Sequence, residues 1–369
     1  MKHVEFEQGK AGTFILGCSR FRLAIIFLAC SAFIAISARE SDALWEKSHA
    51  RDKFIVSKAE YRDVELELVY ESAEKIDLHK GKGLLSLPSI KDFAVRPTVR
   101  VSLVGSRAWV WVDDKLIVNG RLLQSPEGTD PLPPTRVICL PRDDKKIRWE
   151  KYVLRELSPE KANRLLCSLR EGEDFSPIFT GRNLDGWTGA LGSVRVQDEA
   201  IVWQPKKAGV IYTQAEYSDF IVAFEFKLPR GGNNGLAIRY PGKGDPAYTG
   251  MCESQILDDD YETVRNERID ARQIHGSAYG MVAARRGCQR PIGEWNYQEV
   301  TVIGSTIKVE LNGTVILDAD LAKVTHYQGG KAHPGKNRKR GHLGFAGHND
   351  PVMFRNISLK ALDTAPSAL

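Results

Sequence analysis

Short runs in which apolar and polar side chains alternate follow one another along this chain from Trp45 onward. Clear examples are VELELVY (64–70), VRVSLVG (99–105) and AWVWVDDKLIVNG (108–120), which Asp, Gly or Pro residues interrupt. Alternation with a period of two, broken by turn residues, is typical of antiparallel strands with one buried face. The pattern therefore predicts an all-β fold.

One stretch carries a helical signal, residues 158–170. It opens Ser-Pro-Glu, which supplies an N-cap, a first-turn proline and an early acid. We therefore predict a short helical linker over 158–174, between one β region at 45–157 and a second at 175–362.

Three blocks of sequence recur in the same order. They are AEYRD (59–63) with AEYSD (215–219), VSLVGSRAWVWVDDKLIV (101–118) with VTVIGSTIKVELNGTVIL (300–317), and IRWEKYVLREL (147–157) with VMFRNISLKAL (352–362). An ordered internal repeat indicates a tandem duplication of one structural unit. Chance likeness between amphipathic strands is the alternative.

The two copies differ in length. Asp63 and Gly105 are 42 positions apart, whereas Asp219 and Gly304 are 85 apart, so the second copy carries 43 additional residues. Loops carried on a rigid scaffold commonly hold the functional residues. We therefore expect a shortened first unit and the chemistry in the second.

The first 43 residues have the order of a secretory signal. Four basic residues precede an uncharged, mostly apolar run at 23–38, and small residues follow. A membrane helix needs roughly 20 apolar residues, and this run is shorter. We expect export to the periplasm, cell surface or medium with cleavage of the signal. An uncleaved N-terminal membrane anchor is the alternative.

Charge and cysteine content narrow the class further. The 52 Lys and Arg residues exceed the 47 Asp and Glu residues only slightly, so no nucleic-acid partner is expected. The basic stretch KAHPGKNRKR (331–340) lacks interleaved aromatics and is interpreted as a solvated loop. The cysteines beyond the N-terminal segment fit no zinc motif: Cys139, Cys167, Cys252 and Cys288. A Cys252–Cys288 disulfide and buried free thiols both remain open.

The second β region carries an ordered set of motifs. They are PIFTGRNLDGW (177–187), AEYSDFIVAFEFKLPRGGNNGLAIRYP (215–241), ESQILDDD (253–260), HGSAYG (275–280), GEWNYQEVTVIG (293–304), LNG (311–313), GHLGFAGH (341–348) and VMFRNISL (352–359). In these motifs the region 175–362 resembles the 3-keto-disaccharide hydrolase domain family. The resemblance implies a concanavalin A-like jelly roll. With the repeat, it predicts two tandem jelly-roll sandwiches, the first shortened.

The resemblance also implies the substrate class, an oxidised (3-keto) glycoside or disaccharide. Its carbonyl acidifies the hydrogen on carbon 2, so the aglycone can leave by elimination and water can add to the enone. Cleavage of the glycosidic bond then needs a base, a donor to the enolate oxygen and an acid near the leaving oxygen. The catalytic candidates are Glu253, Asp258 and Glu294.

The candidate binding residues are Asn234, Arg239, Gln255, His275, Tyr279, Trp295 and His348. Period two places Glu253 and Gln255 on one strand face, which Asp258 joins only through a bulge. Arg239, His275 and His348 are candidate donors to the enolate. Trp295 is a candidate for stacking on a sugar ring. Ordinary turn, loop or core roles are the alternatives for these residues.

The sequence requires no cofactor and predicts no dedicated metal site. His348, Asn349 and Asp350 leave two interpretations open, a site for a divalent cation and a simple turn. A non-catalytic carbohydrate-binding module is the alternative function, because this sandwich does not by itself fix an activity.

Overall fold

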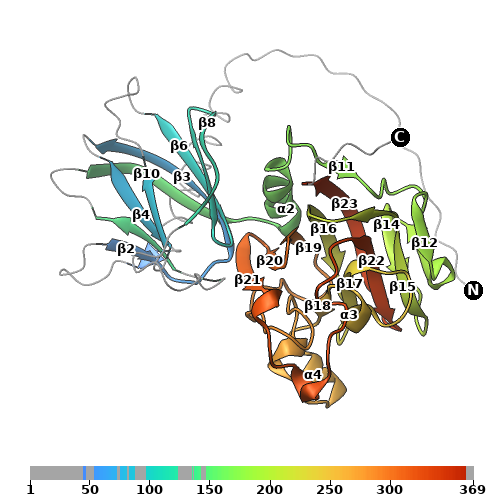
Figure 1. Cartoon of the computed structure of the whole chain (residues 1–369). Helices are drawn as coiled ribbons and strands as arrows, with labels where there is room; N and C mark the ends of the chain where they lie inside the picture. Colours follow the sequence, from blue (N-terminus) through green and yellow to red (C-terminus); the bar gives the residue numbers. More distant parts are fainter. Residues whose placement is uncertain are drawn as a thin grey trace, which may run out of the picture.

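A computed structural model describes residues 45–46, 54–72, 75–80, 83–87, 97–123, 135, 137–142 and 147–362. The predicted export signal, residues 1–43, lies outside the described residues. Within the described part of the chain, no helix is both long and apolar enough to cross a membrane. The described residues form two β sandwiches with a short helix between them (Figure 1).

The first sandwich consists of two five-stranded antiparallel sheets, in the orders β1-β2-β9-β4-β5 and β10-β3-β6-β7-β8. Its strands are β1 (Trp45–Glu46), β2 (Phe54–Ser57), β3 (Asp63–Ser72), β4 (Ile76–Lys80), β5 (Gly83–Leu87), β6 (Thr98–Val104), β7 (Arg107–Val112), β8 (Lys115–Leu122), β9 (Ile138–Pro141) and β10 (Ile147–Glu156). The predicted alternation buries one face: Val64, Leu66 and Leu68 of β3 enter the core. Leu66 lies opposite Val101 of β6, which is buried on the same face.

The second sandwich has a larger sheet, β13-β14-β23-β16-β19-β20-β21 with β11 beside β23, and a smaller one, β12-β15-β22-β17-β18. Its strands are β11 (Ser176–Pro177), β12 (Trp187–Gly189), β13 (Val194–Gln197), β14 (Ala200–Trp203), β15 (Ala208–Tyr217), β16 (Phe220–Lys227), β17 (Asn233–Tyr240), β18 (Cys252–Leu257), β19 (Asn296–Ile303), β20 (Thr306–Leu311), β21 (Thr314–Asp320), β22 (Gly341–His348) and β23 (Met353–Ala361). Phe224, Phe345 and Phe354 pack together in the core between the sheets.

The two sandwiches share one connectivity. The sheet β1-β2-β9-β4-β5 of the first sandwich matches β12-β15-β22-β17-β18 of the second. The sheet β10-β3-β6-β7-β8 matches β23-β16-β19-β20-β21. Asp63 Oδ1 accepts from the Gly105 amide (3.0 Å), and Asp219 Oδ1 accepts in the same way from the Gly304 amide (2.9 Å). The predicted all-β fold of two tandem sandwiches is confirmed. The duplication that would explain the shared connectivity stays a prediction.

The additional residues of the second sandwich are spread over its connections. Residues 258–295 join β18 to β19, whereas residues 88–97 join β5 to β6. Residues 241–251 join β17 to β18, whereas residues 81–82 join β4 to β5. These longer connections include the helices α3 (Pro246–Thr249) and α4 (Tyr261–Arg265). The sequence did not predict them, because about one turn of helix is too short for a helical period to appear.

The linker helix α2 spans Pro159–Ser168, and the side chain of Ser158 caps it by accepting from the Lys161 amide (3.3 Å). Ala162 and Leu166 of α2 lie in one apolar cluster with Trp109 of the first sandwich and Tyr297 of the second. The helix is therefore packed between the two sandwiches rather than extended as a free tether (Figure 1).

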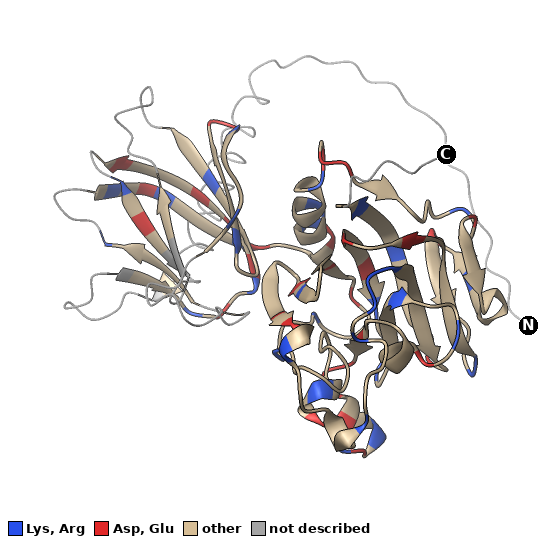
Figure 2. Ribbon diagram, in the orientation of Figure 1, with Lys and Arg blue, Asp and Glu red and all other residues tan. Residues whose placement is uncertain are grey.

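Lys and Arg residues are interspersed with Asp and Glu residues along the ribbons of both sandwiches (Figure 2). On the first sandwich, Arg155 pairs with Glu67 (3.2 Å), and Lys161 of α2 reaches Glu65 (3.1 Å). All four cysteines in the described residues are free, and Cys252 and Cys288 are buried. The structure therefore has buried thiols and not the Cys252–Cys288 disulfide.

Candidate functional site

A cavity of about 330 Å³ lies in the second sandwich over β18 and the long connections. Strands β17, β18 and β22, helices α3 and α4, and two loops contribute its walls. The lining residues are Asn233, Asp245, Ala247, Tyr248, Glu253, Gln255, Leu257, Tyr261, Glu267, Ile269, Gln273, Tyr279, Lys331 and His348. Four sequence-predicted residues are among them: Glu253, Gln255, Tyr279 and His348.

Glu253 is the buried acid of this cavity. Only 4% of the residue is exposed, and no described residue donates a hydrogen bond to its carboxyl group. Burial, with a smaller effect from the nearby Asp245 carboxylate, raises the pKa of Glu253 to about 8. Its side chain lies over Gly235 of β17, where a Cβ atom would come within 2.0 Å of Glu253 Oε1. A poorly solvated carboxyl group of this kind is suited to proton transfer.

Gln255 follows Glu253 on the same face of β18. Its side-chain Nε2 donates to Asn233 Oδ1 (3.1 Å). Its Oε1 is buried and finds no hydrogen-bond partner among the described residues. An unpaired buried acceptor is costly, and a hydroxyl group of a ligand would satisfy it.

The rim combines aromatic rings with charges of both signs. Lys331 Nζ lies 3.5 Å from the centroid of the Tyr248 ring. The hydroxyl group of Tyr279 accepts a hydrogen bond from Gln273 Nε2 (2.8 Å). Asp245 caps α3 by accepting from the Ala247 amide (3.0 Å). The site therefore offers an acid, a cation and aromatic faces within one hollow.

Sequence reasoning missed several of these residues. Asp245 and Pro246 are recognisable as a helix start. Nothing local, however, indicates that α3 lies against β18. Lys331 belongs to the stretch interpreted as a solvated loop, yet it lines the cavity, and the neighbouring His333 is buried.

Two of the three catalytic candidates lie outside the cavity lining. Asp258 comes directly after β18, and its carboxylate accepts from the amides of Gly231 (2.6 Å) and Asp260 (3.1 Å). These bonds close a loop, so no bulge turns Asp258 into the cavity. Glu294 lies in the turn before β19, where its carbonyl accepts from Asn296 Nδ2 (3.4 Å). Of the predicted acids, Glu253 alone lines this cavity.

Arg239 holds the fold together rather than facing the cavity. It is 1% exposed and pairs with Asp219 (2.8 Å). It also donates to the carbonyls of Ser218 (2.7 Å) and Gly304 (2.7 Å). A buried arginine is costly unless it is paired, which is why the sequence suggested that Arg239 faces a ligand. The ion pair and hydrogen bonds within the fold offset that cost instead.

His275 and Asn234 are buried side chains of the core. The His275 ring stacks on Phe226, with 5.1 Å between centroids. Its Nδ1 accepts from the Leu257 amide (3.3 Å), and its Nε2 bonds to Gln298 Oε1 (2.9 Å). Burial lowers the pKa of His275 to about 4, so the ring is neutral. Asn234 Oδ1 accepts from the Gly235 amide (2.9 Å).

The ring of Trp295 packs against two cationic side chains, and Trp295 is not among the residues that line the cavity. Lys227 Nζ lies 4.7 Å from the centroid of its ring, and Arg355 Cζ lies 4.0 Å from it. With 8% of the residue exposed, no face is open for stacking on a ligand.

Within the described residues, no group of three or more His, Cys, Asp or Glu side chains is placed to hold a metal ion. In the turn after His348, Asp350 accepts from the Asn233 amide (3.1 Å) and pairs with Arg265 (2.6 Å). These contacts agree with the interpretation of that segment as a turn.

Comparison with known proteins places the cavity in a recognised domain. A family model described as the 3-keto-alpha-glucoside-1,2-lyase-like domain matches residues 174–360. The 3-keto-disaccharide hydrolase of Bacteroides thetaiotaomicron is 26% identical over 233 residues, which cover 52% of this chain and 80% of that protein. A solved Parabacteroides distasonis protein, assigned as a glycosyl hydrolase, is 25% identical with a TM-score of 0.46, covering 53% of this chain and 97% of its own. Every residue that lines the cavity falls within the matched range.

Proposed function

Since the chain belongs to the 3-keto-alpha-glucoside-1,2-lyase-like domain family, we propose that its second sandwich cleaves the glycosidic bond of 3-keto-glycosides. The observation that carries the proposal is the Glu253 carboxyl group, buried at the cavity with a pKa raised to about 8. The unpaired Gln255 Oε1 beside it would accept a hydrogen bond from a sugar hydroxyl group.

In the proposed reaction, the Glu253 carboxylate takes the proton from carbon 2, next to the keto group. The C–H electrons form the enolate, and Lys331 on the rim stabilises the negative charge on its oxygen. The enolate then re-forms the ketone as the bond from carbon 1 to the aglycone oxygen breaks. The proton held by Glu253 returns to that oxygen, and water adds to the enone to complete hydrolysis.

We also propose that this reaction takes place outside the cytoplasm. The support is the basic, apolar and small-residue order of the first 43 residues. Cell fractionation of the native producer, with an antibody against the second sandwich, tests the location. Recovery with cytoplasmic proteins would contradict the proposal.

The catalytic assignment is tested with the full chain and 3-keto-trehalose, beside unoxidised trehalose. We expect cleavage of the keto sugar alone. The E253Q variant should lose about 10²–10⁴-fold in kcat, the range typical of a general base. The kcat/KM of the wild type should rise with pH and level off above about 8, because the base must be ionised.

The matched control is E294Q, the same chemical change outside the cavity lining, which should leave kcat unchanged. Undiminished turnover by E253Q would refute the assignment. Binding of the keto sugar without turnover by the wild type would favour a carbohydrate-binding module instead.

A further inference from the structure

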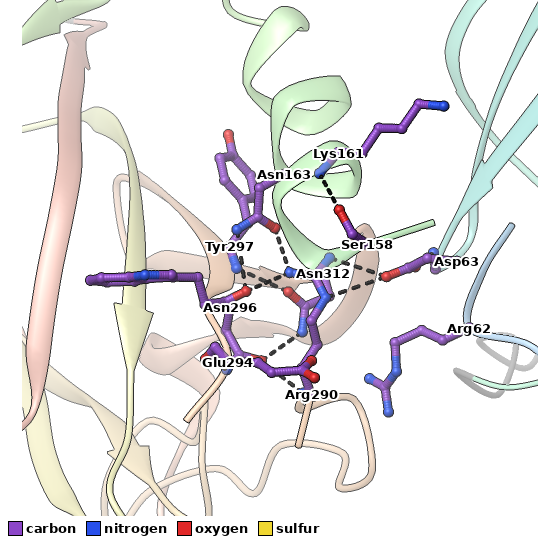
Figure 3. A network of polar contacts seen from close by, with 12 residues as sticks. Arg62, Asp63, Ser158, Lys161, Asn163, Arg290, Glu294, Asn296, Tyr297 and Asn312 are labelled. Carbon is purple, nitrogen blue, oxygen red and sulfur yellow. Dashed lines mark hydrogen bonds and ion pairs between the residues drawn. The ribbon is translucent and has the colours of Figure 1, made fainter. Parts of the chain in front are cut away.

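A buried ion pair joins the two sandwiches (Figure 3). Asp63, the first residue of β3, is 5% exposed. Its Oδ2 accepts from Arg290 Nη2 (3.1 Å) and Nε (3.3 Å), while its Oδ1 is held by the Gly105 amide of its own sandwich. In the second sandwich, the equivalent Asp219 pairs with Arg239 of that same sandwich. Asp63 instead takes its arginine from across the interface.

Arg290 makes further bonds with the same guanidinium group. Its Nη1 donates to Asn163 Oδ1 of α2 and to the carbonyl of Trp295 (2.7 Å). Its backbone amide donates to Asn296 Oδ1 at the start of β19 (2.8 Å). One buried side chain therefore connects the first sandwich, the linker helix and the second sandwich (Figure 3).

Arg62 adds a second contact beside this pair. Its guanidinium group donates to the carbonyl of Cys288 and to that of Gly287 (3.3 Å). The first sandwich thus holds three residues, Gly287, Cys288 and Arg290, within one short stretch of the connection between β18 and β19.

The same stretch supports the cavity wall on its other side. Gln289 Nε2 donates to the carbonyl of Leu257 (2.5 Å), and Gln289 Oε1 accepts from the Asp259 amide (3.1 Å). The Asp259 carboxylate also accepts from the Gly287 amide (3.2 Å), and the Asp259 carbonyl accepts from Arg286 Nη1 (3.0 Å). Leu257 lines the cavity at the end of the strand that carries Glu253.

We infer that the first sandwich is a positioning module for the cavity. Arg62 and Asp63 hold the clamp segment, residues 286–290. The clamp segment in turn fixes the end of β18 and the turn that leads to Tyr261, another lining residue. Arg290 and Asp63 are positioning residues, because they act on the site through this segment. The inference gives the first sandwich a role that the proposed function alone does not supply.

The test compares amide hydrogen exchange over residues 257–262 in the full-length wild type, R290M and D63N. Both variants leave the bonds of Arg62 in place but loosen the clamp segment at Arg290, which should speed exchange over residues 257–262 by about tenfold, as expected for local opening. The double variant should show no more than R290M, because R290M already removes the bonds to Asp63 that D63N weakens. R290K, which keeps the positive charge, should restore part of the protection. If R290M fails to fold, D63N alone still decides.

The matched control is E310Q. Glu310 of β20 pairs with Arg107 across the same interface (2.5 Å), and among the described residues no hydrogen bond or ion pair joins Glu310 to the clamp segment. E310Q should leave exchange over residues 257–262 unchanged. Unchanged exchange in R290M and D63N, or equal acceleration in E310Q, would overturn the inference.

Kinetics provide a second measurement. For a substrate that the wild type cleaves, the clamp variants should raise KM about tenfold and change kcat less than about threefold, because the wall shifts while Glu253 stays in place. Hydrogen exchange needs no substrate. Failure of the proposed function would therefore leave this inference testable, and failure of this inference would leave Glu253 as the proposed base.

Discussion

At the scale of single residues, burial shifts the pKa values of two side chains of the second sandwich in opposite directions. Glu253 and His275 are both almost fully buried, and burial disfavours whichever form carries charge. The pKa of Glu253 is therefore raised to about 8, and that of His275 is lowered to about 4. Glu253 faces the cavity, whereas both ring nitrogens of His275 are engaged by the core. Only the first of them is free to act on a ligand.

These shifts predict a pH dependence of stability. Between pH 4.5, the ordinary pKa of a glutamate, and about pH 8, Glu253 is protonated in the folded protein and ionised in the unfolded chain. The free energy of unfolding therefore falls as pH rises through that window. Between pH 6.5 and about pH 4, His275 is protonated in the unfolded chain and neutral in the folded protein. The free energy of unfolding therefore falls as pH decreases through that window. Each group contributes a slope of about 1.4 kcal/mol per pH unit in its window.

Urea unfolding of the wild type and E253Q at pH 7 and pH 9 measures this effect. E253Q should become more stable relative to the wild type as pH rises between these values. A stability difference that does not change with pH would contradict the raised pKa.

At the scale of elements, the pairing of β17 with β18 shapes the site. Gly235 lies opposite Gln255 in this pair, and the Glu253 side chain occupies the space that a Cβ atom of residue 235 would need. The sequence alone indicates that Glu253 and Gln255 share one face of β18, because side chains of a strand alternate between its two faces. It does not indicate the need for a glycine on the neighbouring strand, because that need depends on which strand lies alongside.

The G235A variant should therefore displace the Glu253 carboxyl group and reduce kcat for a keto sugar by about 10²-fold or more. Its free energy of unfolding should fall by about 1–3 kcal/mol, as is usual for overpacking. Gly192 is the matched control, since no atom lies within 4 Å of its Cβ position, and G192A should retain activity. Full activity in G235A would show that the carboxyl position is not critical.

At the scale of the whole molecule, the sandwiches are joined by polar bonds as well as by an apolar cluster. Arg107 of β7 forms two bonds to the Glu310 carboxylate (2.5 and 2.6 Å) and donates to the Gly120 carbonyl (2.7 Å). Ser106 donates its amide to the carbonyl of Gly313 (3.1 Å). The tip of the β6–β7 hairpin of the first sandwich and the tip of the β20–β21 hairpin of the second therefore meet at the interface.

We predict that R107M destabilises the full chain by about 3–5 kcal/mol, because it leaves the Glu310 carboxylate buried without its partner. The double variant R107M/E310M should recover most of this loss, since neither charge remains. Calorimetry measures both, and separation of one thermal transition into two in R107M would show that the sandwiches have uncoupled. Equal stability of R107M and the wild type would show that the pair contributes nothing.

The sequence by itself determined the all-β class, the tandem arrangement, the linker helix and the shared face of Glu253 and Gln255. These features rest on local periodicity and on an ordered set of motifs, which neighbouring residues along the chain decide. Only the tertiary structure decided the neighbours of each side chain. Arg239 and His275 have the chemistry of site residues, but distant partners bury and satisfy them. Asp245 enters the cavity because α3 packs against β18, and Lys331 because it lies over Tyr248 of α3; such contacts leave no local pattern.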